Sequence, residues 1–222
     1  MANVIVTGAL GALGRAVVST LRARGHRVVA IDLTMGESDA DFLIGGVDLT
    51  DEAAVAAAFS TAVESLGQVT ALINVAGGFT WEPVENGSVD NWDAMYRVNV
   101  RTAVIASRTV LSHLETGAIV NVGAAAATSP GMGMAPYAAS KAGVMALTES
   151  LAVELEPRGI RVNAVLPTIL DTPTNRRDMP DAEMSGWVTP ESAARVVAFL
   201  ISEEAAAVTG VGIKLSRRAV AA

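Results

Sequence analysis

A glycine-rich turn near the amino end constrains this chain more than any other feature. The β-branched run Asn3 to Thr7 (NVIVT) is typical of a short buried strand, and the glycine turn Gly8 to Gly14 (GALGALG) follows it directly. Arg15 to Arg22 has helically spaced apolar residues, and Gly25 marks a helix stop. His26 to Asp32 (HRVVAID) then predicts a second strand. A strand, turn, helix and strand within about 30 residues are typical of one parallel βαβ unit.

The glycines have a physical role in such a turn. Gly takes positive φ without a Cβ clash, and missing side chains let backbone N–H groups approach a pyrophosphate at the helix N-terminus, where the dipole favours anions. Asp32 lies 18 positions after Gly14, a spacing typical of an acceptor for ribose hydroxyls. A carboxylate there repels a 2′-phosphate, so we favour NAD(H) over NADP(H). The alternatives are that Asp32 caps a turn and that Arg15 contributes to a phosphate site.

Strand-like and helical segments alternate along the rest of the chain. We expect an Ala-rich helix capped by Thr50 or Asp51, and a long helical stretch from Ser88 through Leu114. The alternation predicts an α/β fold with a doubly wound parallel sheet and helices on both faces, in a single domain spanning 1–222 with a loose tail from 216 to 222. The further strands are expected at 40–47, 69–75, 117–123, 159–166 and 208–215.

The segment 167–187 is polar, rich in proline and without a clear period. A loop of that length is uncommon in a compact domain unless it is functional. It follows the carboxyl end of a strand, where open α/β sheets bind ligands. We therefore expect residues 168–187 to form a substrate loop or lid.

Charge and composition exclude several classes of protein. The net charge is −7 and no basic run exists, which argues against a nucleic-acid partner. No stretch approaches 18 charge-free apolar residues, so no membrane partner is expected. The chain has no Cys, which excludes disulfides and thiolate metal sites, and we expect no metal. With no signal peptide recognised, we expect a cytoplasmic protein.

The candidate catalytic pair is Tyr137 and Lys141, four residues apart in YAASK. In a helix both side chains project from one face. A phenol titrates near pH 10, and a nearby ammonium would lower that pKa, so the tyrosine could pass a proton to a reacting atom. Taken alone, the spacing is a weak signal, and it is more typical of a solvated pair on a helix face.

Other candidates lie inside the long predicted helix, after predicted strands and in loops. Asn99 sits among apolar residues, where it needs hydrogen-bond partners; it either fixes a helix distortion and holds a water near Lys141, or is an ordinary core amide. Asp48 either holds an adenine amino group or caps a turn. Small residues after the strand at 69–75 leave room for a ligand. Phe79 and Trp81 either line a planar substrate or pack under their loop, and Met132 and Trp187 are further candidate pocket walls.

Together these motifs resemble the short-chain dehydrogenase/reductase family over essentially the whole length. The resemblance implies a seven-stranded Rossmann-type fold, a nicotinamide cofactor, Tyr137 as proton donor and acceptor, Lys141 on the nicotinamide ribose and Asn99 in a proton relay. It also implies a homodimer or homotetramer built through the helices that carry Asn99 and Tyr137. The cofactor-binding residues expected from the motifs and the resemblance are Gly8, Leu10, Gly11, Leu13, Gly14, Asp32, Asp48, Leu49, Ala76, Gly77, Tyr137, Lys141 and Pro167.

Two positions depart from the family pattern. Ala12 stands where the middle glycine of the turn is common, and Ala124 stands thirteen residues before Tyr137, where the family has its catalytic serine. A narrower resemblance, to the quinoid dihydropteridine reductase-like subgroup, accounts for both. The matching pieces are GALG, VAGGF at 75–79, the serine-less loop from Gly123, TSPGM at 128–132 and LPTILDTPTNRRDMP at 166–180.

We therefore expect an NAD(P)H-dependent oxidoreductase that transfers a hydride to a small planar or carbonyl substrate, with Tyr137 as proton donor. Dihydropteridine reductase-like activity is one form of it. The missing serine at Ala124 motivates the alternative, a non-catalytic NAD(H)-binding sensor or scaffold.

Overall fold

The computed structural model describes residues 1–216; the predicted tail, apart from Ser216, lies outside them. Seven parallel strands form one sheet in the order β3-β2-β1-β4-β5-β6-β7, which confirms the predicted doubly wound α/β fold. The strands are β1 (Asn3–Thr7), β2 (Arg27–Ile31), β3 (Phe42–Ile44), β4 (Ala71–Asn74), β5 (Gly117–Val122), β6 (Ile160–Pro167) and β7 (Gly212–Leu215).

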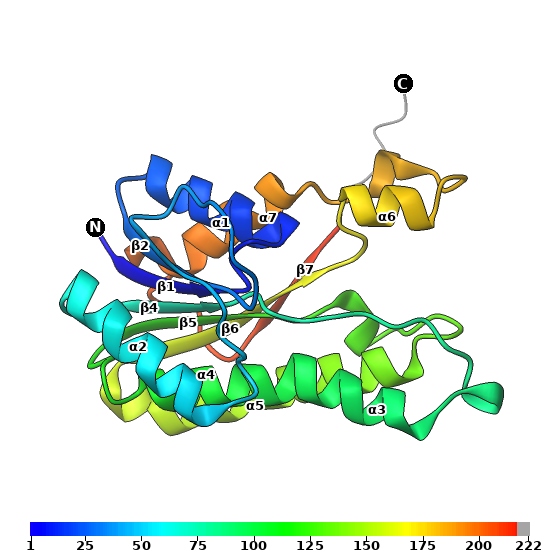
Figure 1. Ribbon diagram of the computed structural model, residues 1–222, viewed down its shortest axis with the longest axis horizontal. Coiled ribbons are helices and arrows are strands. Elements are labelled where there is room, and N and C mark those ends of the chain that lie inside the picture. Colours follow the sequence, from blue (N-terminus) through cyan, green and yellow to red (C-terminus); the bar gives the residue numbers. More distant parts are fainter. Residues whose placement is uncertain (217–222) are drawn as a thin grey trace.

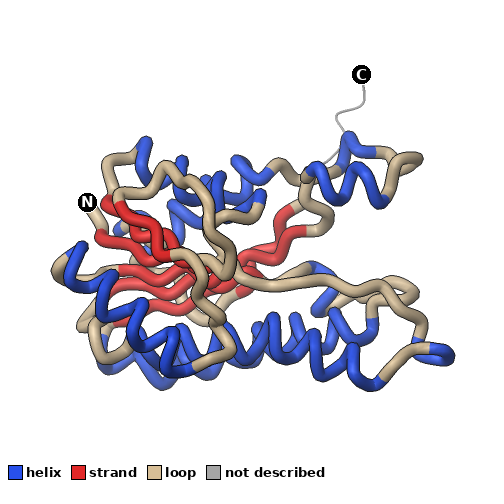
Figure 2. Tube along the Cα trace, in the orientation of Figure 1, coloured by secondary structure: helices blue, strands red, loops and turns tan. Residues whose placement is uncertain are grey.

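Helices cover both faces of this sheet (Figures 1 and 2). One face packs against α1 (Ala12–Ala23) and α7 (Pro190–Leu200), through a core that includes Val17, Leu21 and Val197. The other face packs against α2 (Glu52–Leu66), α4 (Thr102–Val110) and α5 (Ala135–Leu155), through a core that includes Phe59. Because helices bury both faces, the central strands consist mostly of Val, Ile, Leu and Ala, with buried amides at Asn74, Asn121 and Asn163.

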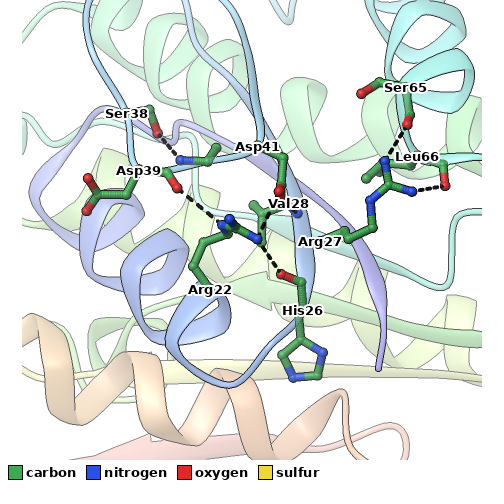
Figure 3. Close-up of polar contacts among 10 residues, drawn as sticks. Arg22, His26, Arg27, Val28, Ser38, Asp39, Asp41, Ser65 and Leu66 are labelled. Atoms are coloured by element: carbon green, nitrogen blue, oxygen red, sulfur yellow. Dashed lines mark hydrogen bonds and ion pairs between the residues drawn. The ribbon is translucent and has the colours of Figure 1, made fainter.

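Arginine side chains close the amino-end side of the sheet (Figure 3). The Arg27 guanidinium donates to the carbonyl oxygens of Ser65 at 2.7 Å and Leu66 at 3.0 Å, the last residues of α2. Arg22 pairs with the Asp41 carboxylate at 2.9 Å and also donates to the His26 carbonyl oxygen. A cation beside the unpaired carbonyl groups of a helix C-terminus is favourable, so the Arg27 guanidinium stabilises this end of α2.

The helical stretch that the sequence places from Ser88 to Leu114 is interrupted. Ser88 caps α3 (Val89–Met95) by accepting from the Asp90 N–H, then a π-helix runs through Tyr96–Arg101, and α4 follows. Asn99 lies inside the π-helix, which confirms the predicted local distortion there. A π-turn widens the helix and is often found at functional sites.

The segment 168–187 is more regular than the sequence indicates. Thr172 caps a short helix, α6 (Pro173–Asp178), by accepting from the Asn175 N–H at 3.2 Å, and Pro173 occupies its first turn. A 3₁₀ turn at Met184–Gly186 and a parallel bridge between Leu170 and Val188 tie its end to the fold. No helix among residues 1–216 is long and apolar enough to cross a membrane.

Candidate active site

A cleft of about 1430 Å³ opens at the carboxyl ends of the strands. It runs from the turn after β1, past the ends of β2, β4 and β5, to the segment that follows β6 and includes α6. Every residue predicted to bind cofactor lines it, together with the predicted substrate residues Phe79, Trp81 and Met132. The topology therefore gathers side chains that are up to 159 positions apart, from Gly8 to Pro167.

The glycine turn fits a dinucleotide diphosphate. Gly8 has φ +64°, and a Cβ there would lie 2.5 Å from the Ala76 nitrogen; a Cβ on Gly14 would lie 2.1 Å from the Gly8 carbonyl oxygen. The first turn of α1 carries no acidic side chain, and its N-cap Gly11 supplies no side-chain acceptor. Backbone N–H groups at this helix start can therefore meet an anion at close range.

Asp32 stands directly after β2 and is nearly buried. Its Oδ2 accepts from the Leu10 N–H at 2.8 Å, and its Oδ1 accepts from the N–H and hydroxyl of Thr34, both at 2.9 Å. The carboxylate thus caps a turn, as the alternative proposed, and also lines the cleft. Arg15 donates to the carbonyl oxygens of Leu10 at 2.9 Å and Glu37 at 2.7 Å, so its guanidinium ties the glycine turn to the next loop.

Asp48 caps a turn, which was one of its two expected roles. Its Oδ1 accepts from the N–H and the hydroxyl of Thr50, both at 2.8 Å, and these bonds hold the pKa of the exposed carboxyl below its usual range. It also lines the cleft. The N-cap of α2 is Asp51, which accepts from the Ala53 and Ala54 N–H groups.

Tyr137 and Lys141 project from α5 into the cleft. The Lys141 amine lies 5.9 Å from the centre of the Tyr137 ring and donates to the Val122 carbonyl oxygen at 2.8 Å. Burial lowers the pKa of Lys141 to about 8. The expected lowering of the tyrosine pKa is wrong in this structure, because burial raises the pKa of Tyr137 to about 12. The phenol therefore holds its proton at neutral pH.

Asn99 does not line the cleft but supports its wall. Its Oδ1 accepts from the Gly78 N–H, and its Nδ2 donates to the Gly78 carbonyl oxygen and to Ser140 Oγ, all at 3.0 Å. Ser140 Oγ in turn donates to the Tyr137 carbonyl oxygen at 2.7 Å. A Cβ on Gly77 would lie 2.6 Å from Asn99 Oδ1 and 3.2 Å from Lys141 Nζ, so these atoms converge beside a position with no side chain.

A second buried chain of amides lies beneath the site. Asn74 Nδ2 donates to Asn121 Oδ1 at 2.9 Å, and Asn121 Nδ2 donates to Thr148 Oγ1 at 2.9 Å. These bonds join β4, β5 and α5, and Thr148 lies about two helical turns after Lys141. The sequence analysis did not single out Asn121 or Thr148, although a polar residue in an otherwise apolar strand or helix face is a visible signal.

Trp187 was expected to line the substrate pocket, and this is wrong. It is only 4% exposed and does not line the cleft, because the 3₁₀ turn before it and the bridge at Val188 direct it into the fold. The cleft wall includes Ile169, Thr172 and Asn175 from the predicted substrate loop. It also includes residues that the sequence analysis missed: Leu33, Thr34, Thr50, Val98, Thr102, Val122 and Met134. For Thr172 the Thr-Pro helix start was available as a signal.

Comparison with known proteins agrees with this geometry. A sequence model of the short chain dehydrogenase family matches residues 2–183. A Xanthobacter autotrophicus protein named inactive 2-(S)-hydroxypropyl-CoM dehydrogenase 2 is 38% identical over 74% of this chain and 79% of its own length.

Two solved structures, each 28% identical with a TM-score of 0.83, carry nicotinamide cofactors. One is a 3-ketoacyl-(acyl-carrier-protein) reductase from Brucella melitensis with NADH, matched over 96% of this chain and 95% of that one. The other is a short chain dehydrogenase from Burkholderia cenocepacia with NADP, matched over 96% of both chains. This chain belongs to the short-chain dehydrogenase/reductase family of NAD(P)-dependent oxidoreductases.

Proposed function

We propose that this protein is a reductase that transfers a hydride from NADH to a small planar or carbonyl substrate, with Tyr137 as the proton donor. The observation that carries the proposal is that Tyr137 and Lys141 line the same cleft as the glycine turn and as the apolar side chains of Phe79, Trp81 and Met132. A phenol with a pKa of about 12 stays protonated at neutral pH, which suits proton donation during reduction better than proton removal during oxidation.

Different residues of the cleft bind the cofactor and transfer the proton. The dinucleotide, when bound, supplies the hydride. The glycine turn and the start of α1 hold its diphosphate, and Lys141 contacts the nicotinamide ribose. The Tyr137 hydroxyl gives its proton to the substrate atom that gains electron density. Asn99 fixes α5 against Gly78 and takes part in the relay that returns a proton to Tyr137. Residues 168–187, including α6, act as the lid over the bound pair.

The preference for NAD(H) rests on Asp32. Three hydrogen bonds from Leu10 and Thr34 hold its carboxylate at the cleft wall, where it can accept from ribose hydroxyls and would repel a 2′-phosphate. The guanidinium of Arg15 is already bound to two backbone carbonyl oxygens, which weakens the case for it as a phosphate ligand.

Among substrates, we favour a quinonoid dihydropteridine. Position 124, where the family has a serine, is a buried alanine, so no side-chain hydroxyl there holds a substrate carbonyl. A ring with its own donors needs such a hydroxyl less. The test is Tyr137→Phe, which should keep NADH binding and lose most NADH oxidation with quinonoid dihydropterin. Full turnover by this variant would remove Tyr137 from the mechanism.

The second candidate is a nucleotide-binding sensor without catalysis. Ala124 favours it, and so does a relative whose name includes the word inactive. NADH consumption measured against dihydropterins, quinones and small ketones separates the two functions. Tight NADH binding with no oxidation across that panel would favour the sensor.

We further propose a cytoplasmic homodimer or homotetramer formed through the helices around Asn99 and Tyr137. Apolar side chains on those helices are exposed, including Val104 on α4 and Val153 on α5. Burying them against a second copy would remove apolar surface from water. Sedimentation of the purified chain tests this, and a monomer at micromolar concentration would reject it.

A further inference from the structure

Two loops are fastened together at the substrate end of the cleft. Trp81 Nε1 donates to the Met132 carbonyl oxygen at 2.9 Å, and the Glu82 N–H donates to the Gly133 carbonyl oxygen at 2.8 Å. Gly133 has φ +73°, and a Cβ there would lie 2.3 Å from the Trp81 indole. We call residues 81–82 and 132–133 the clasp. Its two halves come from the segments after β4 and before α5, and their contact leaves no room for a side chain at position 133.

The clasp gives one wall of the cleft an apolar, aromatic surface. Trp81 is 55% exposed, Met132 81% and the neighbouring Phe79 53%, and all three line the cleft. The Phe79 ring stands edge-on to Tyr137, with centroids 4.9 Å apart and planes at 84°. Large apolar side chains exposed in a cleft mark a ligand surface, and aromatic and thioether groups pack well on flat rings.

The opposite wall is formed by α6, which lies across from the segments that lead to α3 and α5 (Figure 1). It presents Asp178 and Asn175 to the cleft. Asn175 Nδ2 donates to the Leu170 carbonyl oxygen at 2.8 Å, so its Oδ1 is the atom left to accept. Asp178 pairs with Arg177 at 3.2 Å, but both side chains are more than half exposed, and such a pair is weak.

The charges along the cleft are unequal. Among the described residues that line it, Lys141 is the only basic one, and its amine is bound to the Val122 carbonyl oxygen beside Tyr137. Asp32 and Asp48 lie at the nucleotide end, which leaves Asp178 as the charged group on the α6 wall. A ligand carboxylate, phosphate or sulfonate at this wall would face the Asp178 carboxylate, whose partner Arg177 is not among the described residues that line the cleft.

We propose that the substrate is a flat nitrogen heteroaromatic ring that packs on the clasp, presents N–H donors to Asp178 and Asn175, and carries no anionic group. This inference rests on the proposed function because it concerns the same cleft, but it is a statement about recognition, not turnover. An amidine-like N–C–NH₂ edge can donate to the Asp178 carboxylate, whereas a carboxylate on the same ring is repelled.

The test compares two probes with one bicyclic ring, 2-aminobenzimidazole and benzimidazole-2-carboxylate. Binding to the full chain is measured by calorimetry at pH 6.5 with NAD⁺ in excess, so that the nucleotide end is filled. The amine should bind about tenfold or more tightly than the carboxylate. Asp178→Asn should reduce the preference, and Asp178→Lys should reverse it. Asp181→Asn, an exposed acid outside the cleft lining, is the matched control and should leave it unchanged.

Equal binding of the two probes by the unmodified protein would overturn the proposal, as would a preference that Asp178→Lys does not alter. Gly133→Ala tests the clasp separately and should weaken both probes together, because it displaces Trp81; unchanged affinity for both would reject the clasp as a ring-binding wall. Failure of the proposed reductase function would give a different result: the protein would still prefer the amine probe but would not oxidise NADH.

Discussion

Asn99 and Ser140 join two segments 41 residues apart through one hydrogen bond of 3.0 Å, from the amide Nδ2 to the hydroxyl Oγ. Asn99 lies in the π-helix and Ser140 lies one turn after Tyr137, whose carbonyl oxygen accepts from the same hydroxyl. Gly78, which Asn99 binds through two hydrogen bonds, completes the connection from the segment after β4 to α5. The position of Tyr137 therefore depends on a residue that does not touch the cleft.

Ser140→Ala should lower kcat by about tenfold while the KM for NADH stays nearly constant, because the link to Asn99 positions Tyr137 rather than binding nucleotide. Ser140→Thr keeps a hydroxyl and should recover most of the loss. Ser150→Ala is the matched control, since Ser150 contacts only exposed Glu154 in α5. Steady-state kinetics across pH checks this; equal losses in the Ser140 and Ser150 variants would contradict it.

Lys141→Met should stabilise the fold at pH 7. The pKa of this amine falls from 10.5 to about 8 on burial, so the folded state binds fewer protons than the unfolded state between these values, and stability rises with pH across that window. Below pH 8 the folded state carries the full free-energy cost of burying the charged amine, and methionine removes that cost. After the lost hydrogen bond to Val122 is counted, the free energy of unfolding at pH 7 should rise by about 1–3 kcal/mol.

Urea unfolding at pH 7 and pH 10 measures this difference, which should shrink at the higher pH. Lys214→Met supplies the control, because Lys214 is exposed. A Lys141→Met protein that is less stable than the parent at pH 7 would show that burial of the amine is not the dominant cost.

Gly8→Ala and Gly25→Ala form a matched pair. Both glycines have positive φ, +64° and +80°, but a Cβ at position 8 would meet the Ala76 nitrogen at 2.5 Å, while one at position 25 meets nothing within 4 Å. Gly25→Ala should cost about 1 kcal/mol from backbone strain alone. Gly8→Ala should cost about 2 kcal/mol more and abolish NADH binding. Thermal unfolding and a nucleotide titration check both, and similar losses at the two sites would argue against the close packing at Gly8.

Asp32→Ala should change the cofactor preference. Removing the carboxylate takes away the acceptor for ribose hydroxyls and the repulsion of a 2′-phosphate, so the ratio of kcat/KM for NADPH to that for NADH should rise by about tenfold or more. Leu10 and Thr34 lose their acceptor, so some stability is lost as well. Asp39→Ala, an exposed acid in the following loop, should leave the ratio unchanged. A constant ratio in the Asp32 variant would mean that another group sets the preference.

Ala124→Ser should add carbonyl reduction. A hydroxyl at this position, thirteen residues before Tyr137, could hold a carbonyl oxygen beside the phenol, and small-ketone turnover should rise by about tenfold. Turnover of a ring with its own donors should change little. Ala126→Ser, two residues along the same 3₁₀ turn, is the control. A rise in both variants, or in neither, would contradict the role given to position 124.

The doubly wound parallel sheet and the location of the cleft followed from local patterns, since β-branched runs alternating with helical ones have few parallel arrangements. The glycine turn after β1 and the small residues after β4 therefore met at one edge, as expected. The direction of the Tyr137 pKa did not follow, because it depends on burial by segments far away in the sequence. A four-residue spacing shows that Tyr137 and Lys141 share one helix face, but it does not show how far that face is buried from solvent.

The sequence analysis was wrong about the burial of Trp187 and about the helical structure of α6, and in both cases local patterns carried too little information. Short helices have little periodicity, so Pro173–Asp178 read as irregular despite its Thr-Pro start. The burial of Trp187 goes with the 3₁₀ turn before it and with a bridge between Leu170 and Val188, a pairing that no local pattern indicates. Both errors fall in the segment after β6, where function and packing compete for the same residues.

The π-helix at Tyr96–Arg101 also sets how this chain can tolerate changes in length. Each α-helical residue advances the face by about 100°, so deleting one residue there would bring the following helix back into regular phase but rotate Asn99 away from Gly78 and Ser140. A shortened sequence of this kind could gain helical regularity and still lose its catalytic geometry. The position of Asn99 therefore depends on the number of residues in this turn as well as on their type.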